Sequence, residues 1–341
     1  MQKIFFRFNA GGMWGLGHLY RNVALIQEMQ DRGYSPVAII NDFFVSKELL
    51  GQQNIEYLIV DEYESPEKIV GLIKENMSGG SPLLFFDRIL SERFYIETLQ
   101  KNGIKIVCYD DDSRNTFYAD ATINPRLYDI EGVALRYAGP SYQVLRQEVE
   151  YLASQRRTIH RKPEEVLIHF GGTDPMGILE RTFRAIKKVS NIRFVMISGA
   201  AAYNESLSEE INSQEGFTYL RSTEHFAEAL CRADLALLSG GVSLYEACAV
   251  GTPAITLAQN EDQKLTQRIF AEKAGVCDLG MASEYDFGQL RDTMLSILGQ
   301  YARRKTMSRK GKKFVMPGGI GRICDVLEET LSNVSDPGGN K

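Results

Sequence analysis

The chain has 341 residues, a formal net charge of −5 and a sequence pI of about 5.6. Its length predicts two domains with separate cores, and its acidic balance excludes the basic footprint of a nucleic-acid-binding domain. No apolar run approaches the ~20 residues that span a membrane. We expect a cytoplasmic protein, because the five cysteines form no C-x-x-C pair and the first residues read as a strand, not a signal peptide.

Strand and helix patterns alternate over residues 1–145, which we take as the first domain. The strands are short and apolar on both faces, as in a parallel sheet that helices cover on both sides. This predicts a doubly wound, Rossmann-like α/β domain. We expect strands at residues 3–8, 37–40, 56–60, 83–86, 105–109 and 121–123, and helices at 19–32, 46–53, 66–76 and 91–102.

The same alternation restarts after a less regular, polar and basic stretch. We place the domain connection at residues 146–164, a second Rossmann-like domain with C-terminal helices at 165–332, and a flexible tail at 333–341. Two such domains are expected to face each other across a cleft, with ligands at the carboxyl ends of both sheets. The expected strands are at residues 166–170, 193–197, 217–220, 235–238, 254–257 and 276–278. The expected helices are at 178–189, 205–212, 226–232, 244–250, 263–273, 287–298, 301–313 and 319–332.

A glycine-rich turn at residues 9–18 follows the first strand and leads into an amphipathic helix. Its four glycines let the backbone approach a bound group, and a helix N-terminus suits an anion. The positive end of the helix disfavours an imidazolium at His18, which makes a neutral general base available near pH 7. A lone histidine is more often structural, and a ligand diphosphate would offset the helix effect. The protonation state of His18 is therefore open.

A second turn, at residues 238–248, joins a strand to a helix through Gly240 and Gly241. Its N–H groups and the hydroxyls of Ser239 and Ser243 can hold a phosphate or diphosphate. Glu246, one turn into the helix, can accept both hydroxyls of a ribose. The alternative is a tight turn followed by a glutamate that the helix dipole favours. The polar residues that follow at 251–263 favour nucleotide binding.

Two acidic stretches have structural explanations as well as functional ones. Asp174 follows a third glycine turn, at Gly171 and Gly172, and is better explained as a helix cap than as a catalytic group. The run at residues 110–112 suggests a divalent metal, but no further ligand is placed to complete a shell, so a solvated acidic loop with a capping role is favoured. We expect no metal and no cofactor.

These motifs together resemble the PseG/SpsG family. They are Gly-Leu-Gly-His-Leu-Tyr-Arg at 15–21, the two aspartates at 110–111, and the stretches 139–148, 170–175 and 239–263. The family comprises UDP-sugar hydrolases of pseudaminic acid synthesis and spore-coat polysaccharide proteins, which are related to GT-B glycosyltransferases such as MurG. The resemblance runs in order through residues 1 to about 330, and it implies a GT-B-like fold of two Rossmann-like domains.

The resemblance also implies roles for individual residues. His18 matches the family histidine that activates water, and Asn260 matches an active-site asparagine that orients that water or the sugar. The implied reaction is metal-independent and inverting, breaks the C1–O bond, and releases UDP and a free amino or deoxy sugar. The implied nucleotide and diphosphate cradle comprises Ser239, Gly240, Gly241, Val242, Ser243, Glu246, Gly171 and Gly172. The residues assigned to the sugar are Gly15, Gly17, Arg21, Asp87 and Gln263.

The chain departs from the family pattern on the sugar side. Asn9 stands where the family usually has aspartate, and Ile89 stands where it commonly has tyrosine. The sugar, or even the acceptor, is therefore open. The leading hypothesis is a UDP-sugar hydrolase. The alternatives are an inverting GT-B glycosyltransferase, in which His18 activates an acceptor hydroxyl, and a non-catalytic nucleotide-sugar-binding partner protein. Neither the sugar nor the oligomeric state follows from the sequence.

Overall fold

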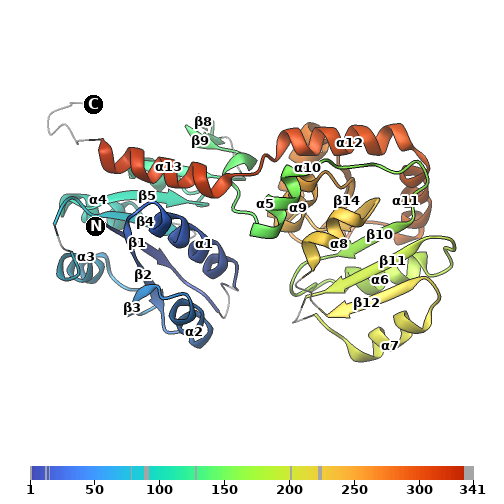
Figure 1. Ribbon diagram of the computed structural model, residues 1–341, viewed down its shortest axis with the longest axis horizontal. Coiled ribbons are helices and arrows are strands. Elements are labelled where there is room, and N and C mark those ends of the chain that lie inside the picture. The colour runs from blue at the N-terminus through green and yellow to red at the C-terminus, as the bar shows by residue number, and fades with distance from the viewer. Residues whose placement is uncertain are drawn as a thin grey trace. The chain divides into compact units, whose positions relative to one another are not determined.

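The computed structural model describes residues 2–11, 14, 16–77, 79–87, 92–126, 129–199, 202–221 and 225–333. Gly15 and Ile89 therefore lie outside the described residues, as does the expected tail from residue 334 onward. The chain forms two compact units (Figure 1). One contains the described residues up to Val144 together with those from Gly318 onward, and the other comprises Leu145–Pro317.

The sheet of the first unit has the strand order β3-β2-β1-β4-β5-β6-β9, with every neighbouring pair parallel. This order is that of a doubly wound sheet, and its direction reverses between β1 and β4. The strands are β1 (Lys3–Phe8), β2 (Ser35–Asn41), β3 (Glu56–Val60), β4 (Leu83–Asp87), β5 (Lys105–Tyr109), β6 (Ala121–Asn124) and β9 (Tyr137–Ala138). A separate hairpin pairs β7 (Asp129–Ile130) with β8 (Val133–Ala134).

Helices cover both faces of this sheet because successive strand residues point to opposite sides. Phe6 packs in the core on the side of α1 and α13, and Phe5 packs in the core formed with α3 and α4. The helices are α1 (Gly17–Asp31), α2 (Phe44–Gln52), α3 (Pro66–Glu75), α4 (Arg93–Lys101) and α13 (Gly319–Ser332), and short 3₁₀ turns lie at Arg114–Tyr118 and Pro140–Tyr142.

The last helix, α13, corrects one expectation, because we assigned it to the second domain and it packs on the first (Figure 1). Val326 and Leu327 are buried in the same core as Leu25 and Ile26 of α1. The helix begins so close to the backbone that a Cβ added at Gly319 would lie 2.1 Å from a carbonyl oxygen. The sequence shows that this helix has an apolar face, but that face alone does not indicate which core it enters.

The second unit repeats the architecture with the strand order β12-β11-β10-β13-β14-β15, again wholly parallel. Its order reverses between β10 and β13. The strands are β10 (Glu165–His169), β11 (Arg193–Ser198), β12 (Phe217–Arg221), β13 (Leu235–Leu238), β14 (Ala254–Ala258) and β15 (Cys277–Met281). The doubly wound fold class expected for both domains is thus confirmed.

The helices of the second unit include one that we did not expect. The segment taken as the connection, residues 146–164, contains α5 (Gln147–Ser154), which packs against α8 and α9. The other helices are α6 (Ile178–Ile186), α7 (Glu205–Ser213), α8 (Phe226–Arg232), α9 (Val242–Val250), α10 (Glu261–Ala274), α11 (Leu290–Gly299) after a 3₁₀ turn at Phe287–Gln289, and α12 (Tyr301–Phe314). Within the described residues, no helix is both long and apolar enough to cross a membrane.

Candidate functional site

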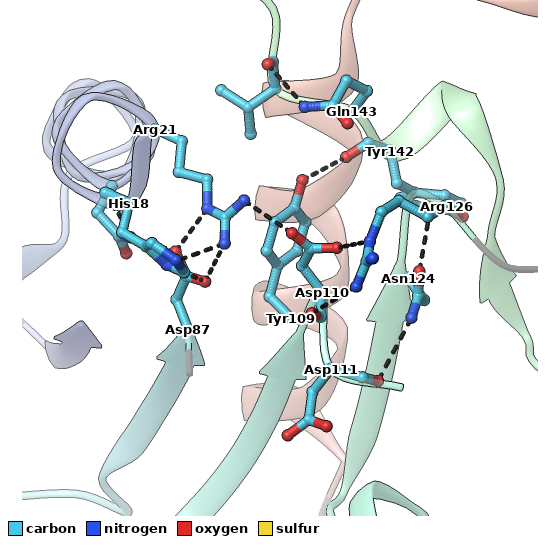
Figure 2. Close-up of polar contacts among 12 residues, drawn as sticks. His18, Arg21, Asp87, Tyr109, Asp110, Asp111, Asn124, Arg126, Tyr142 and Gln143 are labelled. Atoms are coloured by element: carbon cyan, nitrogen blue, oxygen red, sulfur yellow. Dashed lines mark hydrogen bonds and ion pairs between the residues drawn. The ribbon is translucent and has the colours of Figure 1, made fainter. Parts of the chain in front are cut away.

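In a doubly wound sheet, ligands bind beyond the carboxyl ends of the strands at the point where the strand order reverses. In the first unit this point lies between β1 and β4, where Phe8 pairs with Asp87 in the sheet register. His18 stands in the first turn of α1, directly after the glycine-rich turn that follows β1. Figure 2 shows its imidazole against Asp87, the last residue of β4.

Asp87 is held as a buried carboxylate by four hydrogen bonds. Its Oδ1 lies 3.0 Å from His18 Nδ1 and also accepts from Arg21 Nη2, while its Oδ2 accepts from Arg21 Nε and Asn22 Nδ2, each at 2.6 Å. Burial alone would raise the pKa of Asp87, but the charge of Arg21 and the contribution of His18 outweigh burial and hold that pKa well below its usual range. An ionised carboxylate only accepts, so we assign the ring proton of His18 to Nδ1, which leaves Nε2 with a lone pair.

Arg21 fills the space between Asp87 and the end of the next strand, β5. Its Nη1 donates to Asp110 Oδ2 at 2.9 Å, and its guanidinium lies 5.0 Å from the ring centroid of Tyr109 (Figure 2). We expected Arg21 and Asp87 to contact the sugar. Asp87 instead has a fully buried side chain whose acceptor sites are taken, so the geometry directs it toward His18.

The acidic run at 110–112 matches the expected solvated, capping loop only in part, because its three aspartates lie in different environments. Asp111 is fully buried and accepts from the N–H of Ser113 at 2.8 Å, as a capping residue does, and Asp112 is exposed. Asp110 lies between two arginines, because Arg126 Nε donates to its Oδ1 at 2.6 Å. No group of three His, Cys, Asp or Glu within the described residues could hold a metal ion.

Asn9, at the end of β1, accepts a hydrogen bond from a buried arginine. The guanidinium of the fully buried Arg7 donates to Asn9 Oδ1 at 2.6 Å and to the carbonyl of Glu62 at 3.1 Å. An amide oxygen accepts this bond as a carboxylate would. The indole of Trp14 is fixed by the same segment, with its Nε1 2.5 Å from Glu62 Oε1, and it meets the His18 ring edge-on at 6.2 Å.

The second unit places its glycine turns where its own sheet reverses, at the ends of β10 and β13. A Cβ added at Gly171, which has a φ of +87°, would lie 3.9 Å from Ser239 Oγ, so the two turns are adjacent. Gly240 admits no side chain, because its Cβ would lie 2.3 Å from the carbonyl oxygen of Gln263. Gly241 is the N-cap of α9 and brings no capping side chain. The first N–H groups of α9 are therefore suited to an anionic ligand.

The other cradle residues lie around this turn. Val242 and Ser243 begin α9, Val242 being exposed, and Gly172 packs so closely on Gly199 that a Cβ at Gly199 would lie 2.1 Å from its carbonyl oxygen. Asp174 caps α6, as we expected, since its carboxylate accepts from the N–H groups of Ile178 and Leu179 at 2.9 Å.

Glu246 points into the protein, and Arg146 covers its carboxylate. The side chain of Glu246 is fully buried, and Arg146 Nε lies 2.9 Å from Oε1. Neither carboxylate oxygen accepts a well-aligned hydrogen bond within the part of the chain that the structure describes. Burial raises the pKa of Glu246 to about 7, with the charge of Arg146 opposing and that of Glu148 adding to the rise. A ribose could reach this carboxylate only if Arg146, which also packs on Phe226, moved aside.

Asn260 and Gln263, expected at the water and the sugar, form a local cap in this structure. Asn260 Oδ1 accepts from the N–H of Gln263 at 2.9 Å and so caps α10. Gln263 Oε1 accepts from the N–H of Gln259, whose Nε2 reaches the carbonyl of Phe170 at 2.7 Å. Gln259 thus joins the ends of β10 and β14. No role for Arg126 follows from the sequence, and we expected Gln259 and Arg146 to matter only as members of a polar stretch and of a motif, because their partners are not their neighbours in the chain.

Comparisons with known proteins agree with this architecture, although no family model matches the chain. Over 329 residues it is 26% identical to the spore coat polysaccharide biosynthesis protein SpsG of Bacillus subtilis, covering 92% of this chain and 94% of SpsG. MurG of Acinetobacter baumannii is similar in structure, with a TM-score of 0.72 and 13% identity over 96% of this chain and all of MurG. A UDP-GlcNAc 2-epimerase of Neisseria meningitidis, solved with UDP-GlcNAc bound, has a TM-score of 0.65 and 10% identity. The match covers 96% of this chain and 100% of the epimerase. The chain is therefore similar in sequence to SpsG over most of its length, and it has the GT-B fold.

Proposed function

We propose that this protein is a UDP-sugar hydrolase in which His18 activates the attacking water. The observation that carries this proposal is the contact of His18 Nδ1 with the buried, ionised Asp87 at the carboxyl edge of the first sheet. A histidine oriented in this way presents Nε2 as a base, and the carboxylate stabilises the imidazolium that forms.

In the proposed reaction, Nε2 of His18 takes a proton from water while the water oxygen attacks C1 of the sugar. The new C1–O bond forms as the bond from C1 to the diphosphate oxygen breaks, so the electron pair leaves with UDP and the anomeric centre inverts. The N–H groups at the start of α9, beside Gly240 and Gly241, would stabilise the charge that develops on the diphosphate.

The choice of nucleotide sugar rests on the relatives and on the turn at residues 238–248. SpsG is named for polysaccharide biosynthesis, and the structurally similar epimerase was solved with UDP-GlcNAc bound. These names support a UDP-sugar ligand here. A cytoplasmic location is part of the same proposal, since that is where nucleotide sugars are expected to be available.

A GT-B glycosyltransferase is the second candidate. Asn9 and Ile89, where the sequence departs from the family pattern on the sugar side, are the reason to retain it. Trp14, fixed by Glu62 beside His18, places an aromatic wall where the first unit would receive a sugar or an acceptor. The same base would then remove a proton from an acceptor hydroxyl. A third candidate is a nucleotide-sugar-binding protein without activity, which turnover of any nucleotide sugar would exclude.

The test is incubation with a panel of nucleotide sugars, with and without candidate acceptors, followed by NMR of the products. A hydrolase releases free sugar without an acceptor, and reaction in ¹⁸O-water places the label on the sugar. His18→Asn should lower kcat by about 10²- to 10⁴-fold with little change in UDP affinity. Label on the phosphate would overturn the mechanism, full activity of His18→Asn would remove the base, and turnover only with an acceptor would establish the transferase.

A further inference from the structure

We propose that Asp110 is a positioning residue that acts through Arg21 to keep the proton of His18 on Nδ1. The inference rests on the proposed role of His18 as the base. Asp110 is joined to both His18 and Asp87 through the guanidinium of Arg21. Four elements contribute to this connection: the first turn of α1, and the ends of β4, β5 and β6 (Figure 2).

His18 Nδ1 faces two competing partners. Asp87 Oδ1, an acceptor, and Arg21 Nη2, a donor, each lie 3.0 Å from it. A proton on Nδ1 satisfies Asp87 and leaves Nε2 free to take a proton from water. If Arg21 instead donated to Nδ1, the ring proton would move to Nε2, and the imidazole could no longer act as a base toward the substrate side. The orientation of Arg21 therefore selects the tautomer.

Three contacts fix the orientation of Arg21. Its Nε and Nη2 edge donates to Asp87, its Nη1 donates to Asp110, and its face lies against Tyr109. A guanidinium is planar, so anchoring Nη1 on one carboxylate holds the opposite edge on the other. Without Asp110, the Nη2 group would be free to turn from Asp87 toward His18.

Asp110 is itself rigidly held. Its backbone has a φ of +58°, in the left-handed region, and its N–H donates to the carbonyl of Ile123 at 2.9 Å. Aspartate and asparagine tolerate this conformation better than most residues, but it persists only where the surroundings enforce it. Arg126 anchors the outer oxygen of the same carboxylate at 2.6 Å, so the inner oxygen, Oδ2, faces Arg21.

The charges along this connection alternate, which explains why the carboxylate of Asp110 matters and not only its shape. Arg21 has a side chain only 15% exposed and shares its charge between Asp87 and Asp110. A buried cation needs compensating negative charge. If Asp110 were neutral, it would hold Nη1 less strongly, and Nη2 would be freer to donate to His18 Nδ1 in place of Asp87 Oδ1.

The test compares Asp110→Asn with Asp112→Asn. Asparagine keeps the size and tolerates the positive φ, and Asp112 is an exposed aspartate of the same run that lies 3.9 Å from Arg126 without contacting Arg21. The first readout is the ¹⁵N spectrum of protein labelled at histidine, where the loss of signal in His18→Asn assigns one of only four histidines. The second is the separate measurement of kcat and KM on the nucleotide sugar that is turned over.

Asp110→Asn should shift the His18 signal toward the Nε2–H tautomer and lower kcat by about 10- to 100-fold, with KM within about threefold. Asp112→Asn should match the wild type in both. An unchanged tautomer in folded Asp110→Asn would overturn the proposal. If that variant does not fold, Arg126→Gln provides the same test. A smaller shift of the His18 signal is then expected, and the absence of a shift would overturn the proposal. If no nucleotide sugar is hydrolysed by the wild type, the proposed function fails while the tautomer comparison still decides the role of Asp110.

Discussion

The buried carboxylate of Glu246 predicts a measurable dependence of stability on pH. Burial raises its pKa from 4.5 to about 7 in the folded protein, despite the charge of Arg146. Because the folded state binds this proton more tightly than the unfolded chain, the free energy of unfolding falls as the pH rises from about 4.5 to about 7. At about 1.4 kcal/mol per pKa unit, the loss attributable to Glu246 is about 3 kcal/mol.

The assay is the pH dependence of unfolding in the wild type and in Glu246→Gln, which has the same shape and no charge. The difference between the two proteins isolates Glu246 from all other titrating groups. Glutamine should make the second unit more stable at pH 8 by up to about 3 kcal/mol and should have little effect at pH 4. Hydrogen exchange of the α9 amides localises the change. Parallel pH curves for the two proteins would show that Glu246 has an ordinary pKa and refute the argument.

The same titration should appear in nucleotide binding if Glu246 contacts the ribose. An ionised carboxylate accepts both ribose hydroxyls, so affinity should rise with pH through about 7 in the wild type and stay flat in Glu246→Gln. The ligand must be a nucleotide sugar, because its diphosphate has no proton to lose in this range. A pH-independent wild-type affinity, with no loss in Glu246→Gln, would place the ribose elsewhere and leave Arg146 as the permanent partner of Glu246.

Two further predictions concern the first unit. Asp87→Asn should lower kcat by about 10²-fold or more, because the amide no longer stabilises the imidazolium. It should also lower the free energy of unfolding by about 3 kcal/mol, because Arg21 loses a buried charged partner. Steady-state kinetics and urea unfolding measure the two effects, and a variant with wild-type kcat would disprove the role of Asp87. EDTA should leave turnover unchanged, since Asp110 is occupied by two arginines; inhibition that magnesium or manganese reverses would instead make residues 110–112 metal ligands.

Much of the fold could be predicted from the sequence because buried parallel strands read as short apolar runs. Strands such as β1 and β13 begin and end at the residues expected. The pattern could not assign α13 to a unit, because the partner of an apolar helix face is set by the path of the chain. It also missed α5, a short helix between an irregular segment and a polar, basic stretch, of which only Val149 and Ala153 are buried.

The candidate site divides in the same way. Local spacing is sufficient to single out His18 and the turn at Gly240 and Gly241 as candidates. In each case a strand, a glycine turn and the start of a helix lie within one short stretch. Asp110 is different, since its meaning depends on Arg21, which lies 89 residues away, and on Arg126, which comes from the next strand end. From sequence alone, a run of three aspartates suggests a metal or a solvated loop, and neither interpretation anticipates an arginine on each side.

Of the two departures from the family pattern on the sugar side, Asn9 lies within the described residues. Asn9 accepts a hydrogen bond from Arg7 through its amide oxygen, as a carboxylate at that position could. An amide carries no negative charge, and the fully buried arginine also donates to the main-chain carbonyls of Asp61 and Glu62. Those carbonyls belong to the segment whose Glu62 side chain holds Trp14 beside His18. The change at Asn9 and the aromatic wall at Trp14 therefore belong to one local arrangement, and substrate preference should be sought in that arrangement before it is sought in the base itself.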